Sequence, residues 1–237
     1  MYTGPNIVTD QLSLLLDASN EKSYPGSGAD WFDLSKNKIT MSAQGTQTPF
    51  TTVGGVKCFD FNGSGYWQSD SGHENVDFGG DCTLLFWMYA ENLTERDTIF
   101  EKIGYPGYAS YQTEIAVTLE TGENFSYYSR YSPSYDYGGT STMTLSAWNL
   151  MGIKMSTGKT SSARTGFYTK NGSAWVSSYT SRSSTAIIGP AGAVRVGTGY
   201  AGPVENGYIG AVYCYNKMLS DSEVAQMYNA TKERYGL

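Results

Sequence analysis

The sequence has 237 residues, of which 40% are apolar, and this is enough to form the packed core of one large β domain. Its 16 basic and 22 acidic residues give a net charge of −6, so the surface repels phosphate backbones and we expect no nucleic-acid partner. The N-terminus lacks the features of a secretion signal and no stretch reaches about 18 consecutive apolar residues, so we expect no membrane insertion.

Short apolar runs recur along the chain between turn signals. Their length and frequency are typical of a β-sandwich or barrel rather than of alternating strands and helices. The runs 82–89 and 208–215 are apolar on both alternations, which indicates central strands that are covered on both faces, as in two stacked sheets. The expected strands are 12–16, 56–61, 82–89, 97–102, 114–119, 148–155, 165–169, 174–179, 193–197 and 208–215.

One turn motif predicts a specific hairpin. Asn171 and Gly172 readily take the positive φ values of a type I′ turn, which predicts a hairpin over residues 165–179. No linker, repeat or low-complexity block divides the chain, so we expect a single domain over residues 1–237. Within it, residues 1–10 are a candidate for a flexible N-terminal arm.

The last segment of the chain carries the signature of a helix. Ser220 and Glu223 have the spacing of a capping box, and Leu219 and Val224 have the spacing of a hydrophobic staple. The pattern therefore predicts a short C-terminal helix that follows the last strand. The residues expected on its buried face are Val224, Met227, Tyr228 and Thr231.

The three cysteines each lie inside a strand-like run. Because Cys58, Cys82 and Cys214 cannot all pair within one chain, reduced thiols in the core are favoured over a disulfide framework. This use of cysteine indicates synthesis in a reducing compartment.

Residues 14–35 join a buried strand to a long polar loop that holds two aromatic side chains. Tyr24 and Trp31, next to several carboxylates, offer the ring faces and hydrogen-bond acceptors that a sugar site needs. The alternative, which we favour, is structural. In this interpretation the loop folds over the sandwich and Trp31 plugs its edge. Asp33 or Ser35 then bonds to loop amides, and only the outer face of the loop is available for contact with a ligand or partner.

Two tyrosine-rich stretches, 105–111 and 127–139, are the other candidates for a contact surface. Tyrosine, serine and glycine form adaptable binding surfaces, and Arg130 adds a directional donor. Tyrosines that cover the outside of a strand explain the same pattern equally well. The candidate residues for carbohydrate or partner contact are Tyr24, Trp31, Trp67, Tyr105, Tyr108, Tyr128, Arg130, Tyr131, Tyr135 and Tyr137.

Several blocks of the sequence match a known family in the same order. They are SYPGSGADWFDLS (23–35), FDFNGSGYW (59–67), CTLLFWMYAENL (82–93) and YNKMLSDSEVAQMYNA (215–230). With these blocks the chain resembles the laminin-G-like, concanavalin A-like lectin/glucanase domains, especially those in structural proteins of tailed marine bacteriophages. The resemblance extends from Val8 to Leu237. It implies an antiparallel two-sheet sandwich of the jelly-roll type, with rim loops that bind carbohydrate or calcium in some members.

The calcium-binding segments of the family are altered here. Related domains hold the ion with F-D-G-x-D-D-Y and I-D-E-V segments, whereas the matching stretches 61–67 and 209–212 lack the carboxylates that a hard divalent cation prefers. We therefore expect no cofactor and no tight calcium site. A weaker site that uses Asp17, Asp33 or Asn62 stays open.

Catalytic motifs are missing from the sequence. His73 is the only histidine and no nucleophile elbow accompanies it. The glucanase branch of the fold uses an E-x-D-x-x-E strand, whereas the nearest acidic run here, Glu120 to Glu123, lacks that pattern. We therefore expect no enzymatic activity.

The resemblance implies a non-enzymatic virion protein on the surface of a phage particle, made in the host cytoplasm. It would serve as a capsid decoration or a tail-appendage component, with other virion proteins as partners and surface polysaccharide as a candidate ligand. Symmetric particle sites favour a homo-oligomer. The alternative is a free carbohydrate-binding module or adhesin that reads host polysaccharide through Trp31, Trp67 and the 105–137 region.

Overall fold

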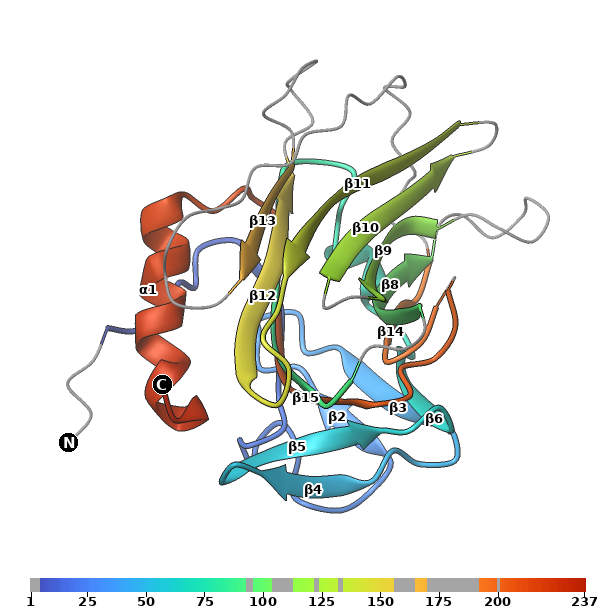
Figure 1. The fold of residues 1–237 in the computed structure, drawn as a ribbon, viewed down its shortest axis with the longest axis vertical. Helices are drawn as coiled ribbons and strands as arrows, with labels where there is room; N and C mark the ends of the chain where they lie inside the picture. Colours follow the sequence, from blue (N-terminus) through green and yellow to red (C-terminus); the bar gives the residue numbers. More distant parts are fainter. Residues whose placement is uncertain are drawn as a thin grey trace.

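The computed structural model of the chain describes residues 5–92, 96–103, 113–121, 124–131, 134–155, 165–169, 192–199 and 201–237. In these ranges the chain forms two antiparallel sheets, and one C-terminal helix stands outside them (Figure 1). The predicted all-β sandwich with a short C-terminal helix is confirmed.

The first sheet contains seven described strands in the order β13-β12-β7-β15-β5-β4, and β1 also pairs with β15. These strands are β1 (Leu12–Asp17), β4 (Phe50–Val53), β5 (Val56–Phe61), β7 (Cys82–Ala90), β12 (Trp148–Met155), β13 (Thr165–Thr169) and β15 (Gly207–Tyr215). Strand β15 is the centre of this sheet. It pairs with β7 along one edge, while β5 and β1 share its other edge.

The second sheet contains eight described strands in the order β11-β10-β9-β8-β14-β6-β3-β2. These are β2 (Asp30–Phe32), β3 (Thr40–Gly45), β6 (Gly65–Ser69), β8 (Asp97–Ile103), β9 (Thr113–Glu120), β10 (Asn124–Tyr131), β11 (Ser134–Thr142) and β14 (Val194–Val196). The helical elements are η1 (His73–Asn75), α1 (Asp221–Thr231) and η2 (Lys232–Tyr235).

Each predicted strand that falls in the described ranges is confirmed, to within about two residues at either end. The run 174–179, and with it the second half of the predicted hairpin, lies outside the described residues. Among the described strands, β13 pairs with β12, and the predicted hairpin stays a prediction. The sequence patterns missed six strands, β2, β3, β4, β6, β10 and β11, most of which are short or rich in polar residues.

The space between the sheets holds the main core. Strand β7 sends Leu84, Phe86 and Met88 into it, because alternate residues of a strand point to one face. Leu85 and Trp87 point the other way and belong to a second apolar cluster on the outer face of the first sheet. Both faces of this strand are therefore buried, as its sequence predicted.

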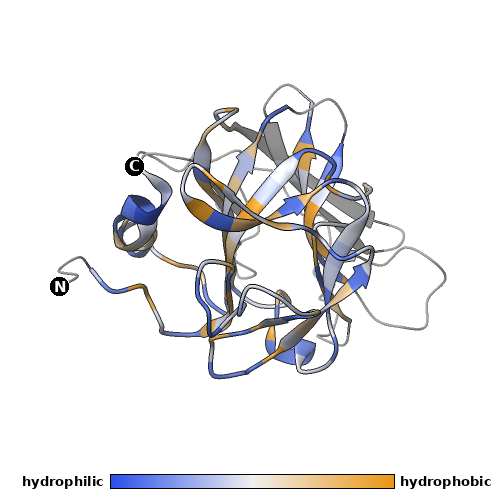
Figure 2. Cartoon of the chain, turned by 90° about the horizontal axis from the view of Figure 1, so that it is seen from below, coloured by the Kyte–Doolittle hydropathy of each residue, from blue (hydrophilic) through white to orange (hydrophobic). Residues whose placement is uncertain are grey.

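The outer face of the first sheet is covered by the C-terminal helical segment and not by another sheet. The ring of Trp87 stacks on Tyr235 with centroids 4.0 Å apart, and its indole nitrogen donates to Thr231 Oγ1 at 3.0 Å. In Figure 1 and Figure 2 the helix and the N-terminal segment lie on this same side of the sandwich. The buried helix residues are Val224, Met227, Tyr228 and Thr231, as predicted.

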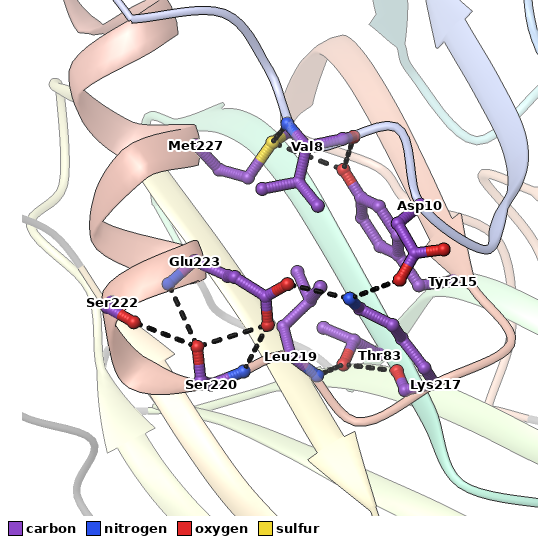
Figure 3. A network of polar contacts seen from close by, with 10 residues as sticks. All are labelled: Val8, Asp10, Thr83, Tyr215, Lys217, Leu219, Ser220, Ser222, Glu223 and Met227. Atoms are coloured by element: carbon purple, nitrogen blue, oxygen red, sulfur yellow. Dashed lines mark hydrogen bonds and ion pairs between the residues drawn. The ribbon is translucent and has the colours of Figure 1, made fainter.

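The predicted capping box starts the helix. The Ser220 side chain accepts from the Glu223 amide at 3.2 Å, and the Glu223 carboxylate accepts from the Ser220 amide at 2.8 Å (Figure 3). Lys217 donates to Glu223 at 2.6 Å and to Asp10 at 2.8 Å. This lysine therefore connects the start of the helix to the N-terminal segment.

Residues 5–10 of the candidate arm are bonded to the last strand and the helix. The Tyr215 hydroxyl donates to the Val8 carbonyl at 2.9 Å, and the Val8 amide donates to Met227 Sδ at 3.1 Å (Figure 3). Gln226 also donates to the Asn6 carbonyl at 2.7 Å. These contacts fix the segment against the helix; residues 1–4 lie outside the described part of the chain.

The three cysteines are free and buried, so the prediction of reduced core thiols is confirmed. Burial raises the pKa of the Cys58 thiol to about 12. Among the described residues, no helix has the length and apolarity needed to cross a membrane.

A β-bulge in β15 sets which side chains face outward. The register of β15 against β7 shifts between Ile209 and Ala211, so one extra residue, Gly210, interrupts the alternation. As a result Tyr208 and Tyr213, five residues apart, both belong to the outer cluster. Strict alternation would have placed them on opposite faces.

The bulge residue also leaves room for the helical cover. A Cβ atom at Gly210 would lie 2.9 Å from the ring of Tyr235, which is buried and stacked on Trp87. We predict that Gly210→Ala lowers the free energy of unfolding by about 1–3 kcal/mol, because a rigid ring has to move. Urea denaturation measures this change. The matched control is Gly80→Ala, whose Cβ meets nothing within 4 Å; equal losses in both variants would refute the steric explanation.

Candidate functional site

The aromatic candidates of the first half of the chain are core residues. Tyr24, Trp31 and Trp67 are 2%, 0% and 0% exposed. All three rings surround Phe59, with centroid distances of 4.7–4.8 Å. The prediction that these rings contact a ligand is wrong, because enclosed rings have no face to offer. The structural interpretation of the 14–35 loop, with Trp31 as a plug, is confirmed.

Asp33 is a buried anchor for this loop. One carboxylate oxygen accepts from the amides of Leu15 at 2.8 Å and Ser35 at 2.7 Å. The other accepts from the Ser35 hydroxyl at 2.6 Å and the Ile39 amide at 3.2 Å. Both oxygens are therefore occupied by protein donors, as the structural interpretation predicted.

The other two calcium candidates, Asp17 and Asn62, have hydrogen-bond and ion-pair partners different from those of Asp33. Asp17 is ion-paired with Arg234 and accepts from the Ser19 amide at 3.0 Å. Asn62 accepts from the Ser64 hydroxyl at 2.5 Å on an exposed turn. In the part of the chain that the structure describes, no group of three His, Cys, Asp or Glu side chains is placed to hold a metal ion.

The tyrosine-rich candidates lie at one edge of the second sheet or outside the description. Tyr105 and Tyr108 are outside the described residues. The backbone of Tyr128, Arg130 and Tyr131 belongs to β10, and that of Tyr135 and Tyr137 to β11, the edge strand among those described. The register places Tyr128 opposite Tyr137 and Arg130 opposite Tyr135. These positions stay predicted contact residues.

A different set of side chains crosses the outer face of the first sheet beside the helical cover. Strand pairing places Asp60 of β5 next to Tyr208 of β15, and Tyr208 next to Tyr89 of β7. The tyrosine rings meet edge to face with centroids 5.8 Å apart, and the Tyr208 hydroxyl donates to Glu91 at 3.4 Å. We call Asp60, Tyr89, Glu91 and Tyr208 the tyrosine row.

Trp148 supports one end of the row. It lies opposite Tyr89 in the β12–β7 register, its ring is 5.9 Å from that of Tyr89, and its indole nitrogen donates to the Val53 carbonyl at 3.1 Å. Trp148 is 4% exposed, whereas Tyr89 and Tyr208 are only partly buried. The tryptophan therefore packs beside Tyr89 at the end of the row, and the two tyrosines retain solvent-accessible surface.

Burial and neighbouring negative charges raise the pKa of two groups in the row, Asp60 and Tyr208. Burial, and then the negative charge of Glu91, raise the pKa of Asp60. Burial, and then the charges of Asp60 and Glu91, raise the pKa of the Tyr208 hydroxyl. The Tyr208 phenol therefore keeps its proton at neutral pH and can donate a hydrogen bond.

This combination suits a ligand with hydroxyl groups and an apolar face. Aromatic rings pack against the C–H face of a sugar, and carboxylates and phenols exchange hydrogen bonds with its hydroxyls. Sequence reasoning missed the row because its tyrosines lie in 82–89 and 208–215, whose continuous apolar character indicated core positions. No sequence motif shows which outward-facing strand residues the C-terminal helical segment leaves uncovered.

Comparison with known proteins finds similarity in the fold and none in the sequence. No family model matches the sequence, and no curated protein sequence matches it. Solved structures do match. The Trypanosoma rangeli sialidase has a TM-score of 0.65 at 14% identity, covering 96% of this chain and 34% of the sialidase.

Botulinum neurotoxin binding domains give the same result. The serotype C1 domain has a TM-score of 0.68 at 11% identity, covering 93% of this chain and 52% of that one. The type G receptor-binding domain has a TM-score of 0.65 at 14% identity, with 92% and 51% covered. The chain thus spans about half of these domains and a third of the sialidase. At such identities the shared property is the fold.

The anchor role of Asp33 is testable by an isosteric change. Asp33→Asn replaces one acceptor oxygen with an amide that faces the donors Ser35 and Ile39, so we expect a loss of about 2 kcal/mol in the free energy of unfolding. The control is Asp30→Asn, because Asp30 is partly exposed and accepts a hydrogen bond from the Ser42 hydroxyl at 3.1 Å. Denaturant titration should show little change for the control, and an unchanged Asp33→Asn variant would contradict the anchor role.

Proposed function

We propose that this chain is a non-enzymatic glycan-binding protein displayed on the surface of a phage particle, as a capsid decoration or a tail-appendage component. The observation that carries the glycan-binding part is the tyrosine row. Its two partly exposed rings and two carboxylates form an open surface of the chemistry that sugars require.

The structural neighbours support this ligand class. The sialidase was solved with the inhibitor DANA, botulinum neurotoxin type C interacts with two ganglioside molecules, and the botulinum DC binding domain was solved with SialylT.

Among the acidic residues first considered for catalysis, Glu120 accepts from Arg96, Thr118 and Ser126 at 2.6–2.9 Å. These bonds give that carboxylate a structural role.

The particle location is supported by the resemblance of residues 23–35 and 215–230 to domains of phage structural proteins. In this proposal other virion proteins and surface polysaccharide are the partners, and the assembly is a homo-oligomer that follows the symmetry of the particle. A free carbohydrate-binding module would use the same row without particle association.

The glycan-binding proposal predicts a specific loss of affinity. On an array of bacterial surface polysaccharides the chain should bind at least one glycan, and Tyr208→Ala or Tyr89→Ala should raise the Kd roughly fivefold or more, because each removes an aromatic contact. Tyr66→Ala is the control, since Tyr66 is a partly buried tyrosine of β6 in the other sheet. Binding that is equally sensitive to all three changes, or absent from the array, would contradict the role of the row.

Acidification supplies an independent readout of the same surface. Because the pKa of Asp60 is raised, protonation removes this acceptor at a higher pH than in an unperturbed aspartate. Affinity should therefore fall as the pH drops toward the acidic side, and Asp60→Asn should make that fall shallower.

Particle association tests the second half of the proposal. Antibody labelling of purified virions should locate the chain on capsid or tail, and size-exclusion chromatography with light scattering should show an oligomer. A monomer that never co-purifies with particles would favour the free module.

A further inference from the structure

A pocket of about 560 Å³ opens on the outer face of the first sheet, at the other end of β15 from the tyrosine row. Its floor includes Leu15 of β1 and Tyr213 of β15, which are partners in the strand register. The N-terminal segment, including Ile7, forms one wall, and the end of the helix with Arg234 forms another. The volume is in the range of small-molecule sites.

An ion pair lies in this pocket. Asp17 is 8% exposed in its side chain and pairs with Arg234, whose side chain is 44% exposed. Because the Asp17 carboxylate also accepts from the Ser19 amide, it is held in place and fixes one end of the guanidinium. The remaining N–H groups of a guanidinium fixed in this way are available donors.

Two phenols lie near the ion pair, and of these Tyr213 lines the pocket. The Tyr235 hydroxyl is buried and has no hydrogen-bond partner in the described part of the chain. Tyr213, 2% exposed and lining the pocket, likewise has no hydrogen bond to its hydroxyl among the described residues. Burial first, and the charge of Asp17 after it, raise the pKa of Tyr213, so its hydroxyl is a donor at neutral pH.

The phenol that lines the pocket, Tyr213, can therefore donate its hydroxyl proton to a ligand. The charged groups lining the pocket are Asp17, Glu233 and Arg234, which sum to one negative charge and disfavour an anionic ligand. Leu15 and Ile7 supply apolar surface next to these polar groups. A neutral ligand with several hydroxyls and an apolar face fits this lining.

We propose that this pocket binds one ring of a neutral pyranose sugar, with Tyr213 and Arg234 donating hydrogen bonds to its hydroxyls. Tyr213 and Tyr208 are five residues apart on β15, roughly 15 Å at the usual rise of a strand, so the pocket is a second site. It does not depend on binding at the tyrosine row.

The test is a titration of the full chain, followed by protein-detected NMR, with three neutral probes and one anionic probe. The neutral probes are methyl α-D-glucopyranoside, methyl α-D-mannopyranoside and methyl β-D-galactopyranoside, and the anionic probe is glucuronate. At least one neutral probe should saturate a single site. Tyr213→Phe, which keeps the ring, should raise its Kd roughly fivefold, and Arg234→Gln roughly tenfold, as expected for the loss of a neutral and a charged hydrogen bond.

The matched control is Tyr66→Ala, in β6 of the other sheet, which should leave this Kd within a factor of two. A Kd that responds to Tyr208→Ala and not to Tyr213→Phe would assign the sugar to the tyrosine row and overturn the pocket site alone. Absence of saturation by every neutral probe, or tighter binding of glucuronate, would also overturn it. If Arg234→Gln unfolds through loss of the Asp17 pair, the conservative Tyr213→Phe variant decides the outcome.

Discussion

The outer face of the first sheet is apolar, and the rest of the structure follows from the need to remove it from water. Trp87, Tyr213 and Tyr215 point away from the sandwich core, where no second sheet can reach them. The C-terminal helical segment and residues 5–10 cover them together. Both candidate sites lie where this cover ends: the pocket between its two parts, and the tyrosine row beyond its edge.

The motif that carries the family resemblance is used for packing. In residues 23–35 the tyrosine and tryptophan surround Phe59, and Asp33 bonds to the amides that bring the loop back onto β1. A shared block of this kind predicts the fold, because it specifies how the edge of the sandwich is closed. It says little about ligands, which agrees with the wide range of proteins that share the fold at 11–14% identity.

The sequence predicted the strands and the helix whose own residues form a distinctive local pattern. Continuous apolar runs predicted the central strands β7 and β15 of the first sheet, and the Ser220–Glu223 pair predicted the start of the helix. Strands β3 and β6 were missed because they are polar and Gly-containing and gain stability only by pairing. The candidate site was missed for a different reason: exposure of Tyr208 depends on a bulge and on the extent of the cover, and neither is local.

The central position of β15 constrains the order in which the chain can fold. This strand separates β7 from β5 and β1, although all three precede it by more than a hundred residues in the sequence. During synthesis the edges of these three strands that face β15 therefore have no partner until residues 207–215 leave the ribosome. Contacts of such long range form slowly, and unpaired apolar edges associate with one another in the meantime. The sandwich is thus closed late by a single strand, and the time before that closure is when aggregation competes with folding.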